Sequence, residues 1–199
     1  MHPSPPLQRP LVLGSTSLYR RELLQRLNLA FEVAAPDVDE APQPGEAPHA
    51  LALRLALAKA HAVAQQYPEA VVIGSDQVAD LAGAPLGKPG HHERAVQQLR
   101  QMRGNTVVFQ TAVAVVCIAT GFEQVDLAAV EVKFRALSDE EIERYLRAEQ
   151  PYDCAGSAKS EGLGITLLDA IQSDDPTALI GLPLIRTCRM LRAAGLVLP

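Results

Sequence analysis

Short apolar runs alternate with helical patterns along the chain, and this alternation predicts a mixed α/β protein. Runs typical of buried strands occur at residues 10–14, 31–35 and 71–73. Two longer runs, at 106–118 and 125–135, predict antiparallel strands joined near Gly121. Helical patterns occur at residues 18–27, 48–67, 91–103, 138–147 and 184–194. Ser17 and Ser138 stand at the starts of two of these helices, where N-capping residues are favoured.

Turn-forming segments separate these elements. Residues 36–48 predict a loop, because they contain four prolines, one glycine and four acids. The sequence GAPLGKPG at 83–90 is hairpin-like, and residues 153–165 are small and rich in glycine. The Pro-rich residues 1–9 predict a flexible N-terminal tail. Because no linker interrupts the remainder, residues 10–199 predict a single domain.

Composition narrows the classes of function. The chain has 199 residues, of which 48% are hydrophobic, and its net charge of -5 argues against a broad nucleic-acid surface. No apolar run reaches the ~18 residues of a membrane span, and the N-terminus lacks the apolar core of a signal peptide. Three scattered cysteines indicate neither a disulfide framework nor a metal site, so a cytoplasmic location is expected.

The sequence LVLGSTSLYRRELL, at residues 11–24, brings anion-binding groups to a strand-to-helix turn. The N-terminus of such a helix presents free backbone N–H groups and the positive end of a dipole. Ser15 and Arg20 at this turn favour a phosphate site. A purely structural interpretation stays open, in which Ser17 caps the helix and the arginines are solvated.

Carboxylates occur at two further places. Asp76 comes shortly after the apolar run at 71–73, where the end of a strand meets a cleft in α/β folds. It is a candidate base or metal ligand, or else an ordinary turn residue. The loop acids at 37–40, Glu40 among them, offer the oxygen ligands that Mg²⁺ or Mn²⁺ prefers, although solvated loop charges give the same pattern.

Two lysines stand out by their surroundings. Lys59 interrupts a helix rich in alanine and leucine, and Lys88 lies between a glycine and a proline. Each alone is typical of a surface lysine, but together with an arginine and hydroxyl groups they suit a triphosphate. Residues 156–164 have the glycines that let a backbone approach a ligand, or that form a flexible loop. The chain has no Walker A or dinucleotide-binding motif.

Several short motifs follow one another in a recognisable order. They are GSTSLYRRELL (14–24), DE (39–40), AKA (58–60), IGSDQV (73–78), GKP (87–89), TAVAVV (111–116), CAGSAKSEGLGI (154–165) and GLPL (181–184). This ordered set covers nearly the whole chain and resembles the Maf family of nucleoside triphosphate pyrophosphatases. The resemblance implies an α/β fold with a mixed, twisted β-sheet flanked by helices and a central cleft, as in Maf and inosine triphosphatase-like proteins.

The resemblance also implies hydrolysis of a nucleoside triphosphate between its α- and β-phosphates, with a divalent metal cation (Mg²⁺, Mn²⁺ or Co²⁺) as cofactor. By position, Asp76 would accept a proton from the attacking water and share the metal with Glu40. The residues expected to line the phosphate path are Ser15, Arg20, Lys59 and Lys88. Homodimers are usual among similar proteins, although no feature of the sequence marks an interface.

Departures from the usual motifs concern the choice of base. Tyr19, Gln77 and Glu161 stand where the pyrimidine-nucleotide branch has Arg, Thr and Gln, and they resemble the YceF branch, which hydrolyses 7-methyl-GTP. Ser75 also replaces the usual alanine beside Asp76. Because a guanine methylated at N7 is cationic, an aromatic face and a carboxylate would both attract it. The expected function is therefore removal of 7-methyl-GTP from the nucleotide pool.

Two other functions stay open at this point. One is a Maf-type pyrophosphatase for pyrimidine or other nucleotides, such as dTTP, UTP or CTP. The other is a nucleotide-binding regulator of division without catalytic turnover. The residues at 19, 77 and 161 argue against the first, and the acids and lysines of the expected site argue against the second.

Overall fold

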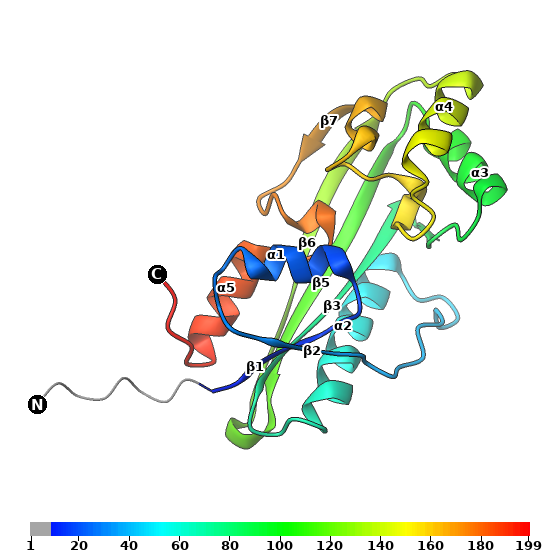
Figure 1. The fold of residues 1–199 in the computed structure, drawn as a ribbon. Helices are drawn as coiled ribbons and strands as arrows, with labels where there is room; N and C mark the ends of the chain where they lie inside the picture. Colours follow the sequence, from blue (N-terminus) through cyan, green and yellow to red (C-terminus); the bar gives the residue numbers. More distant parts are fainter. Residues whose placement is uncertain (1–8) are drawn as a thin grey trace, which may run out of the picture.

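One mixed β-sheet of seven strands runs through the computed structural model, which describes residues 9–199 (Figure 1). Its strands are β1 Leu11–Gly14, β2 Glu32–Ala34, β3 Val71–Leu81, β4 Ala84–Leu86, β5 Thr106–Cys117, β6 Phe122–Phe134 and β7 Leu168–Gln172. The spatial order is β2-β1-β3-β5-β6-β7, and β4 pairs with β3. Strand β1 is parallel to both of its neighbours, whereas the other pairs are antiparallel. This architecture confirms the predicted mixed α/β fold.

The five predicted helices are present, with ends displaced by at most three residues. They are α1 Leu18–Gln25, α2 Pro48–Ala64, α3 His92–Met102, α4 Asp139–Glu149 and α5 Leu184–Ala193, and short 3₁₀ turns are η1 Ile118–Thr120, η2 Ala155–Ser157, η3 Leu163–Leu167 and η4 Ala178–Ile180. Both predicted caps are confirmed: Ser17 accepts a hydrogen bond from the Arg20 amide, and Ser138 forms a capping box with Glu141. None of these helices combines the length and the apolar character that a bilayer crossing needs within residues 9–199.

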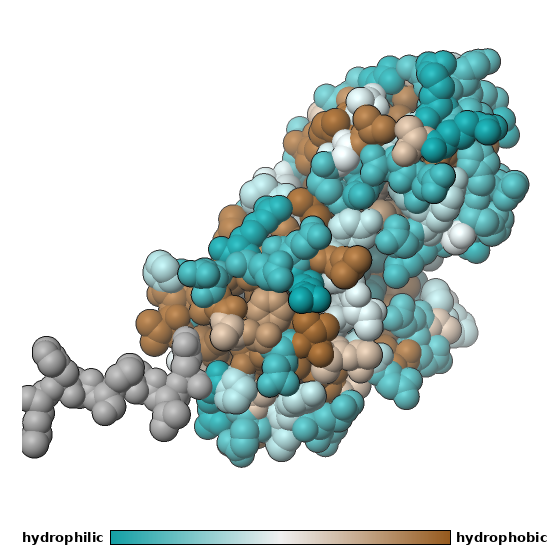
Figure 2. Space-filling model, viewed as in Figure 1, coloured by the Kyte–Doolittle hydropathy of each residue, from teal (hydrophilic) through white to brown (hydrophobic). Residues whose placement is uncertain are grey.

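Helices cover both faces of the parallel part of the sheet because side chains alternate along a strand. Leu13 and Ile73 pack with α1 and α5, whereas Val12 and Val72 pack with α2 on the opposite face (Figure 1). A separate core packs α3 and α4 against β5 and β6, with Phe134 fully buried. The two ends of the sheet thus have separate cores in an elongated molecule, whose surface is mainly hydrophilic around α3 and α4 (Figure 2).

Strands β3 and β7 differ from the sequence prediction. Strand β3 does not stop after residue 73 but continues to Leu81, because β5 pairs with it over residues 72–80 and overrides the turn preference of Gly-Ser-Asp. Strand β7 is short and exposed and has no apolar alternation that would reveal it. The predicted tail, residues 1–9, lies outside the described residues except for Arg9, whose guanidinium bonds the Glu69 carboxylate at 3.0 Å.

Gly74 sets how closely α2 approaches β3. A Cβ at this position would lie 2.3 Å from the Ala56 carbonyl oxygen and 2.5 Å from the Ala60 amide nitrogen. Gly74→Ala is therefore expected to lower the free energy of unfolding by about 3 kcal/mol, the upper end of ordinary overpacking losses. Urea unfolding measures this loss. Gly87→Ala is the matched control, because a Cβ there meets no atom within 4 Å; equal stability of the two variants would contradict the prediction.

Candidate active site

The edge of β3 is open between the ends of two neighbouring strands. On this edge β1 pairs with residues 71–74 and β4 with residues 79–81, while β5 occupies the other edge. Residues 75–78 therefore lie beside the point where β1 ends and the chain turns into α1. Helix N-termini and the carboxyl ends of parallel strands are the usual places for anionic ligands in α/β folds.

Asp76 lies in the middle of β3, and not at a strand end as the sequence pattern predicted. Strand alternation turns its side chain toward α2, where the buried Lys59 ammonium lies 2.7 Å from Asp76 Oδ1. The same ammonium lies 2.7 Å from Glu40 Oε1 on the loop before α2. The Lys59 and Asp76 side chains are 6% and 10% exposed, whereas Glu40 is 60% exposed. One buried cation thus connects two acids at the edge of the site.

The charges around Glu40 show which groups converge here. Its burial would raise the pKa of the Glu40 carboxyl, but the hydrogen bond from Lys59 and the charges of Lys59, Lys88 and Arg20 outweigh this and lower it. Lys88 itself is exposed and follows β4. The two lysines and the arginine expected to bind phosphate therefore act on one carboxylate.

Ser15 and Arg20 join the cluster from the β1–α1 turn. Arg20 Nη1 lies 3.4 Å from the buried Ser15 Oγ, and Arg20 Nε donates to the Gly181 carbonyl at 2.8 Å. Burial lowers the pKa of Arg20, against the opposing charges of Asp76 and Glu40. The guanidinium is thus held in place by the protein. Arg21 is exposed, as the sequence interpretation of a solvated charge expects.

Tyr19 lies at a second part of the site, beside the glycine-rich segment. The Lys159 ammonium is 5.4 Å from the centre of the Tyr19 ring, and Cys154 Sγ is 3.8 Å from its hydroxyl. Burial raises the pKa of Tyr19, and Cys154, Asp153 and Glu161 raise it further. Glu161 is exposed and close enough for its charge to act on both Tyr19 and Lys159. The structure therefore brings the predicted residues Tyr19 and Glu161 to one region.

Gln77 is engaged differently from the other two predicted specificity residues. Its amide nitrogen lies 2.9 Å from Thr111 Oγ1 and 3.0 Å from the carbonyl oxygens of Ala178 and Leu179. These three acceptors share the two hydrogens of the Gln77 amide group. A direct contact between Gln77 and a base stays a prediction.

The two carboxylates on Lys59 also suit a divalent cation. Within residues 9–199 no group of three or more His, Cys, Asp or Glu side chains forms a closed metal site. Mg²⁺, however, commonly uses one or two carboxylates and completes its shell with water and substrate phosphates. Glu40 and Asp76, which share one bonded ammonium, fit that donor set.

Two supporting residues were not identified from the sequence. Arg54 on α2 holds the acid-bearing loop through paired bonds of 2.6 and 2.8 Å to Glu46 and one of 3.0 Å to the Ala41 carbonyl. The Arg54 hydrogen bond lowers the pKa of Glu46 to about 2. Lys159, the second, is bonded to Glu149 at 3.3 Å. An isolated Arg or Lys gives no signal in a sequence when its partner lies in a distant loop or helix.

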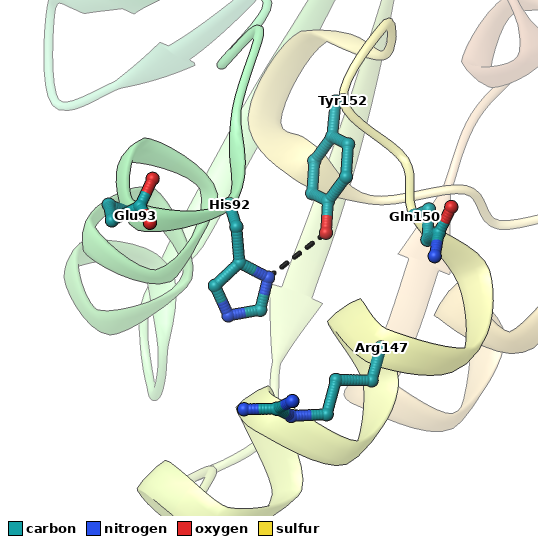
Figure 3. A pocket seen from close by; sticks show the side chains of 5 residues that line it. All are labelled: His92, Glu93, Arg147, Gln150 and Tyr152. Atoms are coloured by element: carbon teal, nitrogen blue, oxygen red, sulfur yellow. Dashed lines mark hydrogen bonds between the residues drawn. The ribbon is translucent and has the colours of Figure 1, made fainter.

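The hollow drawn in Figure 3, of about 440 Å³, lies apart from this cluster. It is lined by His92, Glu93, Arg147, Gln150 and Tyr152. His92 Nδ1 is 3.0 Å from the Tyr152 hydroxyl, and its Nε2 is paired with Glu143. None of the site residues predicted from the sequence lines this hollow.

The site combines two acids with a buried lysine and an arginine beside a helix N-terminus, and this combination is suited to a polyphosphate ligand.

The family model described as Maf-like protein matches residues 10–194, and the chain belongs to the Maf family. A Polaromonas relative is 77% identical over 97% of this chain and 88% of its own length. A relative from Albidiferax ferrireducens is 72% identical over 97% of each chain. One from Aromatoleum aromaticum is 61% identical over 95% of this chain and 97% of its own. All three are named 7-methyl-GTP pyrophosphatase.

Proposed function

We propose that this protein hydrolyses 7-methyl-GTP to 7-methyl-GMP and diphosphate and so removes a modified nucleotide from the pool. The observation that carries the proposal is the buried Lys59 ammonium between Asp76 and Glu40, beside Arg20 and the start of α1. The names of relatives up to 77% identical support the substrate.

The phosphate path would work mainly through charge. Arg20, Lys59 and Lys88 neutralise charge on the triphosphate, and Ser15 donates a hydrogen bond to it, which together reduce the repulsion of an incoming nucleophile. Asp76 takes a proton from the water that attacks the α-phosphorus, and the bond from that phosphorus to the bridging oxygen breaks, releasing diphosphate. A divalent cation held by Glu40 and Asp76 would add Lewis-acid stabilisation of charge on the phosphates.

The base would be selected at Tyr19 and Glu161. A cation over an aromatic ring is stabilised by ~0.5–2 kcal/mol, and Lys159 already lies over the Tyr19 ring. The cationic 7-methylguanine suits the same aromatic face. Glu161 adds a negative charge and can accept hydrogen bonds from guanine N1–H and its amino group.

Glu161→Gln tests this assignment. The variant is expected to reduce the preference for 7-methyl-GTP over GTP by roughly twofold to fivefold, because one partly screened charge is worth about 0.5–1 kcal/mol. Steady-state kcat/KM for 7-methyl-GTP, GTP and UTP measures the change. Glu131→Gln, the same replacement at an exposed acid of β6, is the control. An unaltered preference in Glu161→Gln would show that the carboxylate does not select the base.

The function itself is tested by a panel of canonical and modified nucleotides, assayed for diphosphate with Mg²⁺, Mn²⁺ or Co²⁺. Fastest turnover of 7-methyl-GTP supports the proposal, and fastest turnover of UTP, CTP or dTTP assigns the protein to pyrimidine nucleotides. Binding without turnover indicates a regulator. A cytoplasmic location fits the substrate and the free thiols of Cys117, Cys154 and Cys188.

A further inference from the structure

The turn at residues 178–181 is fixed through its backbone carbonyls by side chains from three other elements. The donors are Gln77 and Thr111 to Ala178 at 3.0 Å, Gln77 to Leu179 at 3.0 Å, Ser75 to Gly181 at 3.0 Å, and Arg20 to Gly181 at 2.8 Å. Each donor belongs to α1, β3 or β5, so the position of the turn depends on the elements that also carry the site residues.

Strand alternation explains why β3 supplies two of these donors. Asp76 points toward α2 and Lys59, so Ser75 and Gln77 on either side of it point to the opposite face. On that face Ser75 is fully buried, and its Oγ lies 2.8 Å from the Ala112 carbonyl as well as 3.0 Å from Gly181. Ser75 and Gln77, which flank the proposed general base Asp76, therefore bond the turn at 178–181, on the other face of β3 from Lys59.

The Gly181 carbonyl connects this turn to the phosphate site. It accepts from Arg20 Nε and from Ser75 Oγ, whose single hydroxyl hydrogen is shared with the Ala112 carbonyl. A Cβ on Gly181 would lie 3.6 Å from Arg20 Nε. The same guanidinium is placed on its other side by Ser15 and lies within electrostatic reach of Asp76 and Glu40. Moving the Gly181 carbonyl would therefore move Arg20.

We propose that Ser75 and Gln77 are positioning residues that fix the turn at 178–181 and, through the Gly181 carbonyl, aim Arg20 at the triphosphate. This inference rests on the proposed function. It assigns to Gln77 an indirect role in the handling of phosphate, which all nucleotides share, in place of a direct contact with the base. It also assigns a role to Ser75, whose hydroxyl is absent where the motif has alanine.

The test is a double-mutant cycle on kcat/KM. Ser75→Ala and Gln77→Met are each expected to lower kcat/KM by roughly fivefold to twentyfold, the scale of losing a hydrogen bond that places a charged group. The loss should be similar for 7-methyl-GTP and GTP. When Arg20 is already replaced by alanine, the additional loss from Ser75→Ala should fall below about twofold, because coupled residues are not additive.

Two results would overturn the proposal. The first is that Ser75→Ala lowers kcat/KM equally in the wild-type background and in the Arg20→Ala background. The second is that Gln77→Met lowers kcat/KM for one of the two nucleotides and leaves it unchanged for the other. Thr187→Val is the control: its buried hydroxyl donates to the Pro183 carbonyl at 2.8 Å, outside the turn, and activity should be retained. Ser75→Cys replaces Ser75→Ala if the alanine variant does not fold. A wild-type protein that releases no diphosphate refutes the proposed function, whereas an active wild type with additive variants refutes this inference alone.

Discussion

Asp76→Asn is expected to lower diphosphate release from 7-methyl-GTP by roughly 10²- to 10⁴-fold, the contribution typical of a positioned general base. Asparagine has nearly the same shape as aspartate, and its carbonyl oxygen still accepts the hydrogen bond that Lys59 now gives to Asp76 Oδ1 at 2.7 Å. The amide cannot take up a proton from the attacking water, however, and it is a poor ligand for a divalent cation. Release of diphosphate at saturating nucleotide and metal measures the loss.

The control for this variant is on the same strand. Asp80→Asn changes an acid of β3 whose Oδ1 accepts from the Gly83 amide at 2.7 Å, in the turn toward β4. It should retain activity, and both variants should keep the far-UV circular dichroism of the wild type. If the rate of Asp76→Asn stays within tenfold of the wild-type rate, the general base must be a group other than Asp76. If it still binds nucleotide while turnover is lost, the binding site and the chemistry are separated.

Much of the secondary structure could be predicted from local patterns in the sequence. The turn from β1 into α1 and the caps at Ser17 and Ser138 depend on neighbours within a few residues, so they are visible in a short window. The long strands β5 and β6 were evident from their apolar pattern and the turn at Gly121. These features depend on backbone geometry that the adjacent residues themselves determine.

The errors come from contacts between distant residues. Strand β3 continues through Asp76 because β5, more than thirty residues later, supplies the hydrogen bonds that a local pattern cannot show. The three partners of Gln77 are 34, 101 and 102 residues away along the chain. Lys159 meets the Tyr19 ring only because the fold brings the glycine-rich segment to α1. Motif order could identify the residues of the site, but only tertiary structure shows which of them bond the protein itself.

Lys59→Met should lower both the stability of the protein and its release of diphosphate. The Lys59–Asp76 pair is nearly buried, and removing one partner of such a pair costs about 3 kcal/mol because the other charge stays without compensation. The variant is therefore expected to unfold at lower urea and to lose most diphosphate release, since a phosphate-neutralising charge is missing. Urea unfolding and the diphosphate assay measure the two losses. Lys133→Met removes an exposed lysine of β6 and should leave both properties unchanged.

Added Mg²⁺ distinguishes a purely structural lysine from one that shares its acids with a metal. Without the ammonium, Glu40 and Asp76 lose the one cation that is bonded to both of them, so a divalent cation that binds both should stabilise the folded state by mass action. The urea midpoint of Lys59→Met should therefore rise with Mg²⁺ more steeply than that of the wild type. The further replacement Glu40→Gln should remove this dependence. A midpoint insensitive to Mg²⁺ in Lys59→Met would exclude these two carboxylates as the metal ligands, whatever the activity of the variant.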